Sequence, residues 1–232
     1  MIIFNGTALE SIAPVKIEDV RVSPIQLSAT ARQRPIQWGA DFVRMTGGSR
    51  TVTVTFALPT NDTHARQNQL REVTRWALSD APGKLYVPVH DGVYLEAICT
   101  GLPDPSTRQW WESRLRLVFT TMGNPFWTSD NEKHTSCGTA FTALGDALPL
   151  MRIERTLTGA ASNQSYGDGA RTMTFSTIPA GALTIDLNRQ TAEVDGVSIM
   201  QYYALTGRFI RPALGAQTIT GTGTVYWRER WC

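Results

Sequence analysis

Few residues in this chain could act as a nucleophile or a general base. Its 232 residues include three histidines, His64, His90 and His134, and three cysteines. Nucleophilic catalysis pairs a serine or cysteine with a base, which is most often histidine. None of the histidines lies in a motif that carries such a mechanism, and the chain has no GxSxG, HExxH or GxxxxGK[ST] motif. We therefore predict a protein that is not an enzyme and has no cofactor.

The cysteines could serve as metal ligands or as disulfide partners. Cys99, Cys137 and Cys232 are an odd number without CxxC spacing, which favours reduced thiols. His134 and Cys137 have His-x-x-Cys spacing, but structural zinc takes four ligands and no second pair follows. The prediction is therefore no metal site, with Cys99 in the core of a strand.

Carboxylates offer another chemistry, because glycoside hydrolysis needs only two of them at a suitable separation. Among 20 acidic residues, the nearest clusters are Glu18-Asp19, Asp186 and Glu193. Each is adjacent to an expected strand or turn, where a solvated face or an Asx-turn explains an acidic side chain. We assign none of them a catalytic role.

Aromatic residues could instead make an interface. Trp110 and Trp111 are adjacent, so a strand would direct one ring inward and one outward, and an outward tryptophan more often anchors a protein than a sugar. The segment from Arg32 to Gly48 is expected to be either an extended loop that reaches a neighbouring subunit or a hairpin folded onto its own sheet. Its candidate interface residues are Arg32, Arg34, Trp38 and Phe42.

Charge and hydropathy exclude several other partners. The net charge is +2, from 22 basic and 20 acidic residues, so no strong field steers the protein toward nucleic acid or an anionic membrane. The first residues do not resemble a secretory signal, and no apolar run has the length of a membrane span. We expect a protein made in the cytosol, without membrane contact.

Strands are expected to position most of the candidate side chains named above. Two-residue alternation of apolar and polar residues, typical of half-buried strands, runs from Arg50 to Leu58 and recurs in residues 85–89, 93–99 and 114–119. The His-Asp-Gly sequence of residues 90–92 predicts a tight turn with a positive φ at Gly92. Antiparallel sheet is therefore expected.

One segment has helical spacing. Residues 63–79 place Leu70, Val73 and Ala77 on one face, with polar residues before them and Pro82-Gly83 after. This is the one helix predicted with a defined start and stop, and Trp76 is expected to cover the edge of the sheet.

Residues 124–148 have little periodicity, which predicts a linker or crossing loop and a domain boundary near residue 130. Beyond it, short strands are expected at residues 151–156, 171–177, 183–187, 192–194 and 222–230. Turn-forming clusters at residues 166–169 and 195–196 separate them. The whole is predicted to be mainly β, with domains 1–130 and 131–232, the second an all-β sandwich or jelly roll.

Taken in order, several stretches give the chain a resemblance to the distal tail proteins of siphophages. The stretches are Ile3-Phe4-Asn5-Gly6, Gly48-Ser49-Arg50 with the strand after it, the helix with Leu70 and Trp76, Asn124-Pro125-Phe126-Trp127, Ile185-Asp186-Leu187, Val194-Asp195-Gly196, and the ending Val225-Tyr226-Trp227-Arg228-Glu229-Arg230-Trp231. Each motif is weak alone, and their order and spacing carry the resemblance.

The resemblance implies an N-terminal β-sandwich with one α-helix that closes a six-membered ring, and a galectin-like β-sandwich projecting from it. The implied protein is a homohexamer at the virion tail tip, assembled in the host cytoplasm. Its implied partners are the tail tube protein, the tail hub protein and receptor-binding proteins, and DNA only passes through its lumen. The alternatives are a carbohydrate-binding module, a tail-associated hydrolase and another tube-forming tail protein.

Overall fold

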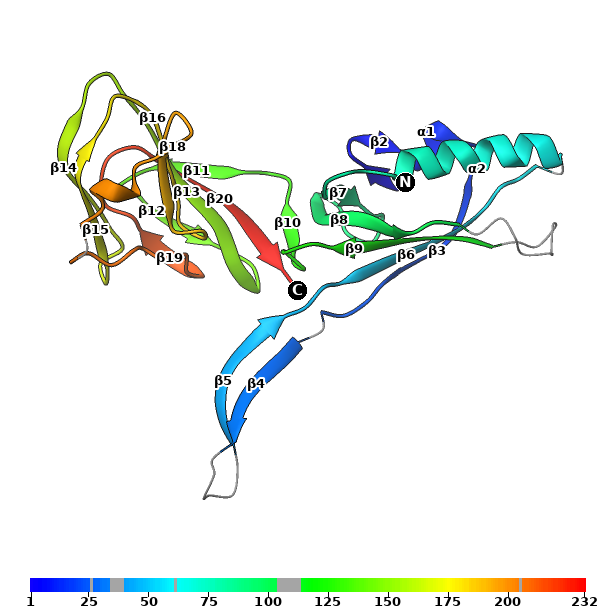
Figure 1. Ribbon diagram of the computed structural model, residues 1–232, viewed down its shortest axis with the longest axis horizontal. Coiled ribbons are helices and arrows are strands. Elements are labelled where there is room, and N and C mark those ends of the chain that lie inside the picture. The colour runs from blue at the N-terminus through cyan, green and yellow to red at the C-terminus, as the bar shows by residue number, and fades with distance from the viewer. Residues whose placement is uncertain (26, 34–39, 61, 104–113, 205) are drawn as a thin grey trace. The chain divides into compact units, whose positions relative to one another are not determined.

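The computed structural model describes residues 1–25, 27–33, 40–60, 62–103, 114–204 and 206–232, and only the backbone of residues 27–33 and 40–47. The chain forms two compact units, Met1–Trp127 (unit 1) and Thr128–Cys232 (unit 2). Most of the described residues lie in strands, which confirms the predicted mainly β, two-domain chain (Figure 1).

Unit 1 is built on an antiparallel sheet in the order β3, β6, β9, β8, β7, β1, β2. These strands are β1 (Ile3–Phe4), β2 (Thr7–Ala8), β3 (Lys16–Val22), β6 (Thr51–Ala57), β7 (Gly83–Tyr86), β8 (Val93–Gly101) and β9 (Leu115–Thr121). The predicted alternation in β6 is confirmed, because Val52, Val54 and Phe56 are fully buried while the threonines between them are partly exposed. The sheet therefore has one apolar and one polar face.

Helix α2 (Thr63–Ala77) covers the apolar face and confirms the predicted helix, although it ends two residues earlier than expected. Asp62 caps it by accepting a hydrogen bond from the His64 amide at 3.0 Å. Trp76 packs edge-on against Phe4 and Phe119, with ring centroids 5.9 and 6.1 Å away. A short helix, α1 (Leu9–Ile12), was not predicted.

The predicted hairpin of residues 85–99 is confirmed, with a different turn. Strand β7 ends at Tyr86, so Val87 and Val89 belong to the connection and Val89 is 55% exposed. Pro88 explains the early end, because it has no amide hydrogen to donate to a sheet. Gly92 has the expected positive φ, +72°.

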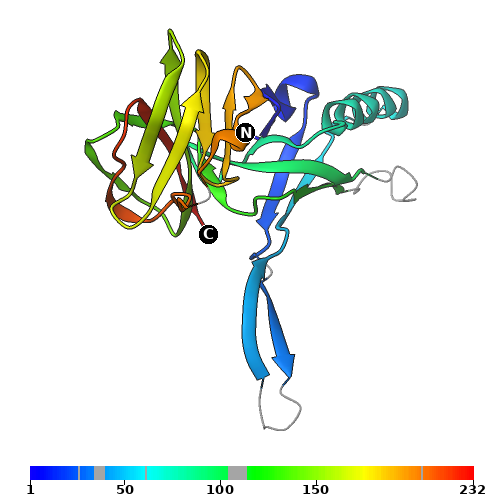
Figure 2. The same cartoon turned by 60° about the vertical axis from the view of Figure 1, so that its left-hand side comes forward.

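Strands β4 (Leu27–Gln33) and β5 (Ala40–Gly47) form an antiparallel hairpin, here called the arm. The arm continues the β3–β6 pair and is a sheet of its own (Figure 2). At its base the Ser23 amide donates to the Thr51 carbonyl, and the Thr51 amide donates to Ser23 Oγ, both at 2.8 Å. Within the described ranges, no other strand pairs with the arm.

Unit 2 contains an antiparallel sheet in the order β18, β17, β16, β13, β20, β11 and two smaller sheets, β12–β19 and β14–β15. The strands that confirm predictions are β13 (Ala147–Leu157), β15 (Thr172–Ile178), β16 (Gly181–Asp186), β17 (Thr191–Val194) and β20 (Thr224–Trp231). The other strands of these sheets are β11 (Lys133–Ser136), β12 (Ala140–Ala143), β14 (Ala161–Gly167), β18 (Val197–Ser198) and β19 (Gly215–Thr218), and a 3₁₀ turn lies at Met200–Tyr202. Apolar side chains of all three sheets share one core, including Ile153, Phe175 and Trp227.

The predicted linker at residues 124–148 is wrong. The segment contains β10 (Trp127–Ser129), β11 (Lys133–Ser136) and β12 (Ala140–Ala143), and β13 begins within it. β11 pairs with β20 (Lys133 opposite Trp227), and β12 pairs with β19 (Ala140 opposite Thr218), so both partners lie far along the chain. Local periodicity missed them because these strands are short, and β11 has no buried residue to mark its inner face.

Candidate functional site

Of the four residues predicted for an interface, Arg32 and Phe42 belong to the arm strands, whereas Arg34 and Trp38, like Trp110 and Trp111, lie outside the described residues. In the backbone register, Arg32 is opposite Asp41 and Phe42 is opposite Ala31. Each arm strand has one partner in the described part of the chain, so its other edge presents amide and carbonyl groups that another chain can pair with. These unpaired backbone groups make the arm a candidate protein interface.

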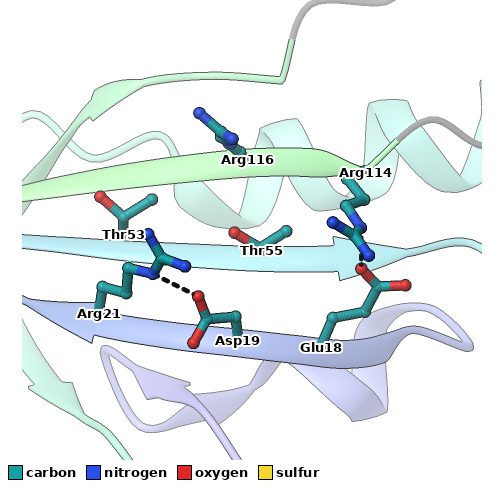
Figure 3. A pocket seen from close by; sticks show the side chains of 7 residues that line it. All are labelled: Glu18, Asp19, Arg21, Thr53, Thr55, Arg114 and Arg116. Carbon is teal, nitrogen blue, oxygen red and sulfur yellow. Dashed lines mark hydrogen bonds and ion pairs between the residues drawn. The ribbon is translucent and has the colours of Figure 1, made fainter.

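A second candidate is a hollow on the polar face of unit 1, lined by side chains from three adjacent strands and the residue before β9 (Figure 3). The lining residues are Glu18, Asp19, Arg21, Thr53, Thr55, Arg114 and Arg116. The threonines of β6 lie between the charged residues of β3 and the arginines at β9 (Figure 3). Every residue that lines the hollow therefore has a polar or charged side chain.

Register and ion pairs position the side chains in the hollow. Asp19, Thr55 and Arg116 are directly opposite one another across β3, β6 and β9. Arg21 Nε lies 2.6 Å from Asp19 Oδ2, and Arg114 Nε lies 3.0 Å from Glu18 Oε2. Both acids of the predicted Glu18-Asp19 cluster are thus paired with arginines.

Unit 2 has a more buried charge cluster, the Glu132 network, made of Glu132, Arg152, Glu154 and Arg228. Arg152 donates from both terminal nitrogens to Glu132 at 2.5 and 2.9 Å, and from Nε to Glu154 at 2.5 Å. Arg228 Nε donates to Glu132 at 3.2 Å. The hydrogen bond from Arg152, helped by the charges of both arginines, holds the pKa of Glu132 below its ordinary value.

Sequence reasoning did not identify this network. Glu132 is 20 residues from Arg152 and 96 from Arg228, and no local motif joins them. Arg152 also lies over the ring of Tyr226 at 4.8 Å, and that ring contacts His134 at 5.6 Å. The row His134, Tyr226 and Arg152 follows the register of three neighbouring strands.

Asp186 and Glu193 lie in the turn and strand positions expected of them. Asp186 Oδ1 accepts hydrogen bonds from the amides of Asn188 and Arg189, both at 2.9 Å, which is the Asx-turn expected there. Glu193 is exposed on β17. These observations explain both acids without a reaction.

The cysteines are free thiols, and Cys99 lies in β8 as predicted but is only partly buried. Burial raises the pKa of the Cys99 and Cys137 thiols, which lowers their thiolate fraction at neutral pH. In the described residues, no group of three or more histidine, cysteine or acidic side chains could hold a metal ion. No helix in the same residues is long and apolar enough to span a membrane.

No protein-family model and no curated protein sequence matches the chain. Solved structures do match the chain. One is a phage p2 baseplate in its activated conformation with calcium, at a TM-score of 0.47 and 7% identity over 94% of this chain and 91% of that one. Another is the crystal structure of the SPP1 Dit protein, described as a paradigm of the hub adsorption apparatus in phages that infect Gram-positive hosts. With a TM-score of 0.73 and 12% identity over 100% of this chain and 98% of that one, this chain has the fold of SPP1 Dit along its whole length.

Proposed function

We propose that the protein is a structural, non-enzymatic component of a phage tail tip. In this proposal it forms a hexameric ring that connects the tail tube to the tail hub and the receptor-binding apparatus and leaves a lumen for DNA. The observation that carries the proposal is the full-length likeness to SPP1 Dit, because both units of this chain are matched in one chain of that hub protein.

The two units have separate roles in this proposal. Residues 1–130 form the ring, and residues 131–232 form a peripheral, galectin-like sandwich that offers a surface to other tail proteins. Separate cores support the division, since each unit is compact by itself. Partner proteins would bind the periphery while the ring carries the mechanical load.

The arm is the proposed contact between neighbouring ring subunits. A ring needs a heterologous interface, in which one surface of a subunit binds a different surface of the next. The arm supplies a surface of that kind, because it continues the β3–β6 pair beyond Ser23 and Thr51 and leaves its outer strand edges unpaired in the described structure. Arg32 and Phe42 belong to its strands, and Arg34 and Trp38 fall between those strands in the sequence.

The carbohydrate-binding alternative finds less support. A sugar-binding platform needs an open aromatic face. On the outer face of unit 2, the ring of Tyr226 is covered by Arg152 and contacts His134. This aromatic group is therefore engaged within the protein.

Native mass spectrometry with negative-stain imaging of the full chain tests the ring. The expected result is an open ring of six 25.6 kDa chains, about 154 kDa. A variant in which a short Gly-Ser linker replaces residues 26–47 is expected to be a folded monomer, because it keeps the sheet and loses the arm. A matched variant with the same linker inserted after Gly159, an exposed turn of unit 2, should still form the ring.

The proposal would be overturned if the full chain stayed monomeric by itself and also after addition of purified tube protein or purified hub protein. An arm-deleted variant that still closes into rings would remove the arm from the interface and leave the ring itself standing. Binding to a glycan array by a monomeric chain would favour the carbohydrate-binding alternative.

A further inference from the structure

The hollow on unit 1 contains hydrogen-bond donors that the protein itself does not use. Glu18 and Asp19 are the acids that line it, and each already has an arginine partner, Arg114 and Arg21. Arg116 is exposed, and among the described residues its guanidinium has no ion-pair or hydrogen-bond partner. Pairing two acids with two of three arginines leaves one uncompensated positive charge.

The hydroxyl groups beside that charge are also unused. Thr53 and Thr55 are both on the polar face of β6, and in the described structure neither side-chain hydroxyl has a hydrogen-bond partner. Thr55 is directly opposite Arg116 in the sheet register, which places their Cβ atoms about 5 Å apart. Arg116, Thr53 and Thr55 therefore all line the same hollow.

We propose that Arg116, Thr53 and Thr55 form an oxyanion site that takes a phosphate group. Guanidinium presents a planar fork of donors that fits two oxygens of a phosphate, and hydroxyls can donate to a third. A cation would be repelled by the uncompensated arginine. A flat apolar ligand would find no apolar side chain in the lining.

The paired arginines neutralise the charge of the two acids that line the hollow. Without Arg21 and Arg114, two carboxylates would repel an anion from the hollow. With them, Asp19 and Glu18 are neutralised, and Arg21 and Arg114 keep further donors on the same face, where their side chains are 82% and 75% exposed. Because the site is open to water, we expect weak and salt-sensitive binding.

Two sources could supply the phosphate, a free phosphate ion or a phosphodiester of DNA. The DNA source depends on the proposed passage of DNA through a ring, whereas the oxyanion site depends only on unit 1. Failure of the ring experiment would therefore leave this inference intact, and failure of phosphate binding would leave the ring intact.

The test is a titration of the full chain followed by amide and arginine side-chain NMR. Sodium phosphate, and in a second arm a short DNA duplex, are added at constant ionic strength with sodium chloride as the balance. We expect saturable shifts on β3, β6 and β9 around Thr53, Thr55 and Arg116. Arg116→Gln is expected to weaken phosphate binding about tenfold or more, since it removes the charge and the fork together.

Two further variants make the result specific. Arg75→Gln removes the same charge from the exposed side of α2 and is expected to change phosphate affinity by less than about twofold, because exposed charges outside the site are screened. Thr53→Val with Thr55→Val keeps β-branched side chains in the sheet and is expected to weaken binding while the heat-denaturation midpoint stays near that of the native chain.

Each outcome of the titrations either supports or contradicts the oxyanion site. Saturation by phosphate that Arg116→Gln abolishes supports the site, and the same shifts with duplex identify phosphodiesters as a source. Shifts that grow linearly without saturation, or that Arg75→Gln reduces as much as Arg116→Gln does, would overturn the site and leave only screening of surface charge.

Discussion

Unit 2 contains buried and partly buried charges whose partners come from distant parts of the chain. Glu229 is only 5% exposed, and its Oε1 accepts from Lys133 Nζ at 2.7 Å and from the Leu144 amide at 3.1 Å. The Glu132 network joins β13 and β20 to the residue before β11. Removing one member of such an ion pair leaves the charge of the other member unpaired, at a position that water solvates poorly.

Lys133→Met is predicted to lower the free energy of unfolding by about 1–3 kcal/mol, because it leaves the Glu229 carboxylate with only the amide of Leu144. Urea denaturation measures the change. Lys16→Met, at an exposed lysine of β3, should have almost no effect. In a double-mutant cycle, Glu229→Gln should recover part of the loss, and strictly additive effects would contradict the coupling.

The Glu132 network predicts a pH dependence of stability. The pKa of Glu132 is lower in the folded chain than in the unfolded one, so its contribution is complete above the ordinary glutamate pKa of about 4.3 and is lost as pH falls through the folded value. Glu132→Gln should be less stable than the native chain at pH 7, and the difference should narrow below about pH 4. Thermal midpoints between pH 7 and 3 measure it.

Glu193→Gln is the matched control, since Glu193 is exposed on β17 of the same unit. It should leave the midpoint at pH 7 almost unchanged. A gap between the native chain and Glu132→Gln that stays constant down to pH 3 would show that the carboxylate charge is not the cause.

At the scale of elements, the sheets depend on close approach between backbones. Gly223 immediately precedes β20, with a φ of +125°, and a Cβ there would lie 2.6 Å from the Glu154 carbonyl oxygen. The Gly223 carbonyl also accepts a hydrogen bond from the Cys137 amide at 2.9 Å, next to β11. This glycine therefore allows β13, β20 and the end of β11 to meet.

Gly223→Ala is predicted to destabilise the chain by about 1–3 kcal/mol, from the strained backbone and the contact with a carbonyl that cannot move easily. Gly159→Ala is the comparison, because Gly159 has no positive φ and nothing within 4 Å of the added Cβ. Its effect should stay under about 1 kcal/mol. Equal midpoints of denaturation for the two variants would contradict the role of Gly223.

At the scale of the whole molecule, the two units have separate cores. Residues 128–232 contain all the strands of the second core and the complete Glu132 network. We expect this segment to fold when expressed alone and to unfold in one cooperative transition, as a domain with its own core does. Circular dichroism and calorimetry measure this, and a segment without a cooperative transition would show that unit 2 needs unit 1 to fold.

Several features of the fold were predictable from local pattern. The period of two in residues 50–58 reports which side chains share a face, and Val52, Val54 and Phe56 are indeed the buried ones. Helix α2 was predictable because Leu70, Val73 and Ala77 recur at helical spacing between an N-cap and Pro82. The mainly β character and the free thiols followed from the same kind of local observation.

Only the tertiary structure decided which residues meet. The pairing of β11 with β20, the convergence of Glu132 with Arg152 and Arg228, and the meeting of Asp19, Thr55 and Arg116 all join segments distant in sequence. The sequence by itself determined local faces and turns, because these depend on neighbouring residues. Strand order and charge convergence depend on long-range packing, so the hollow and the Glu132 network emerged only once the chain was folded.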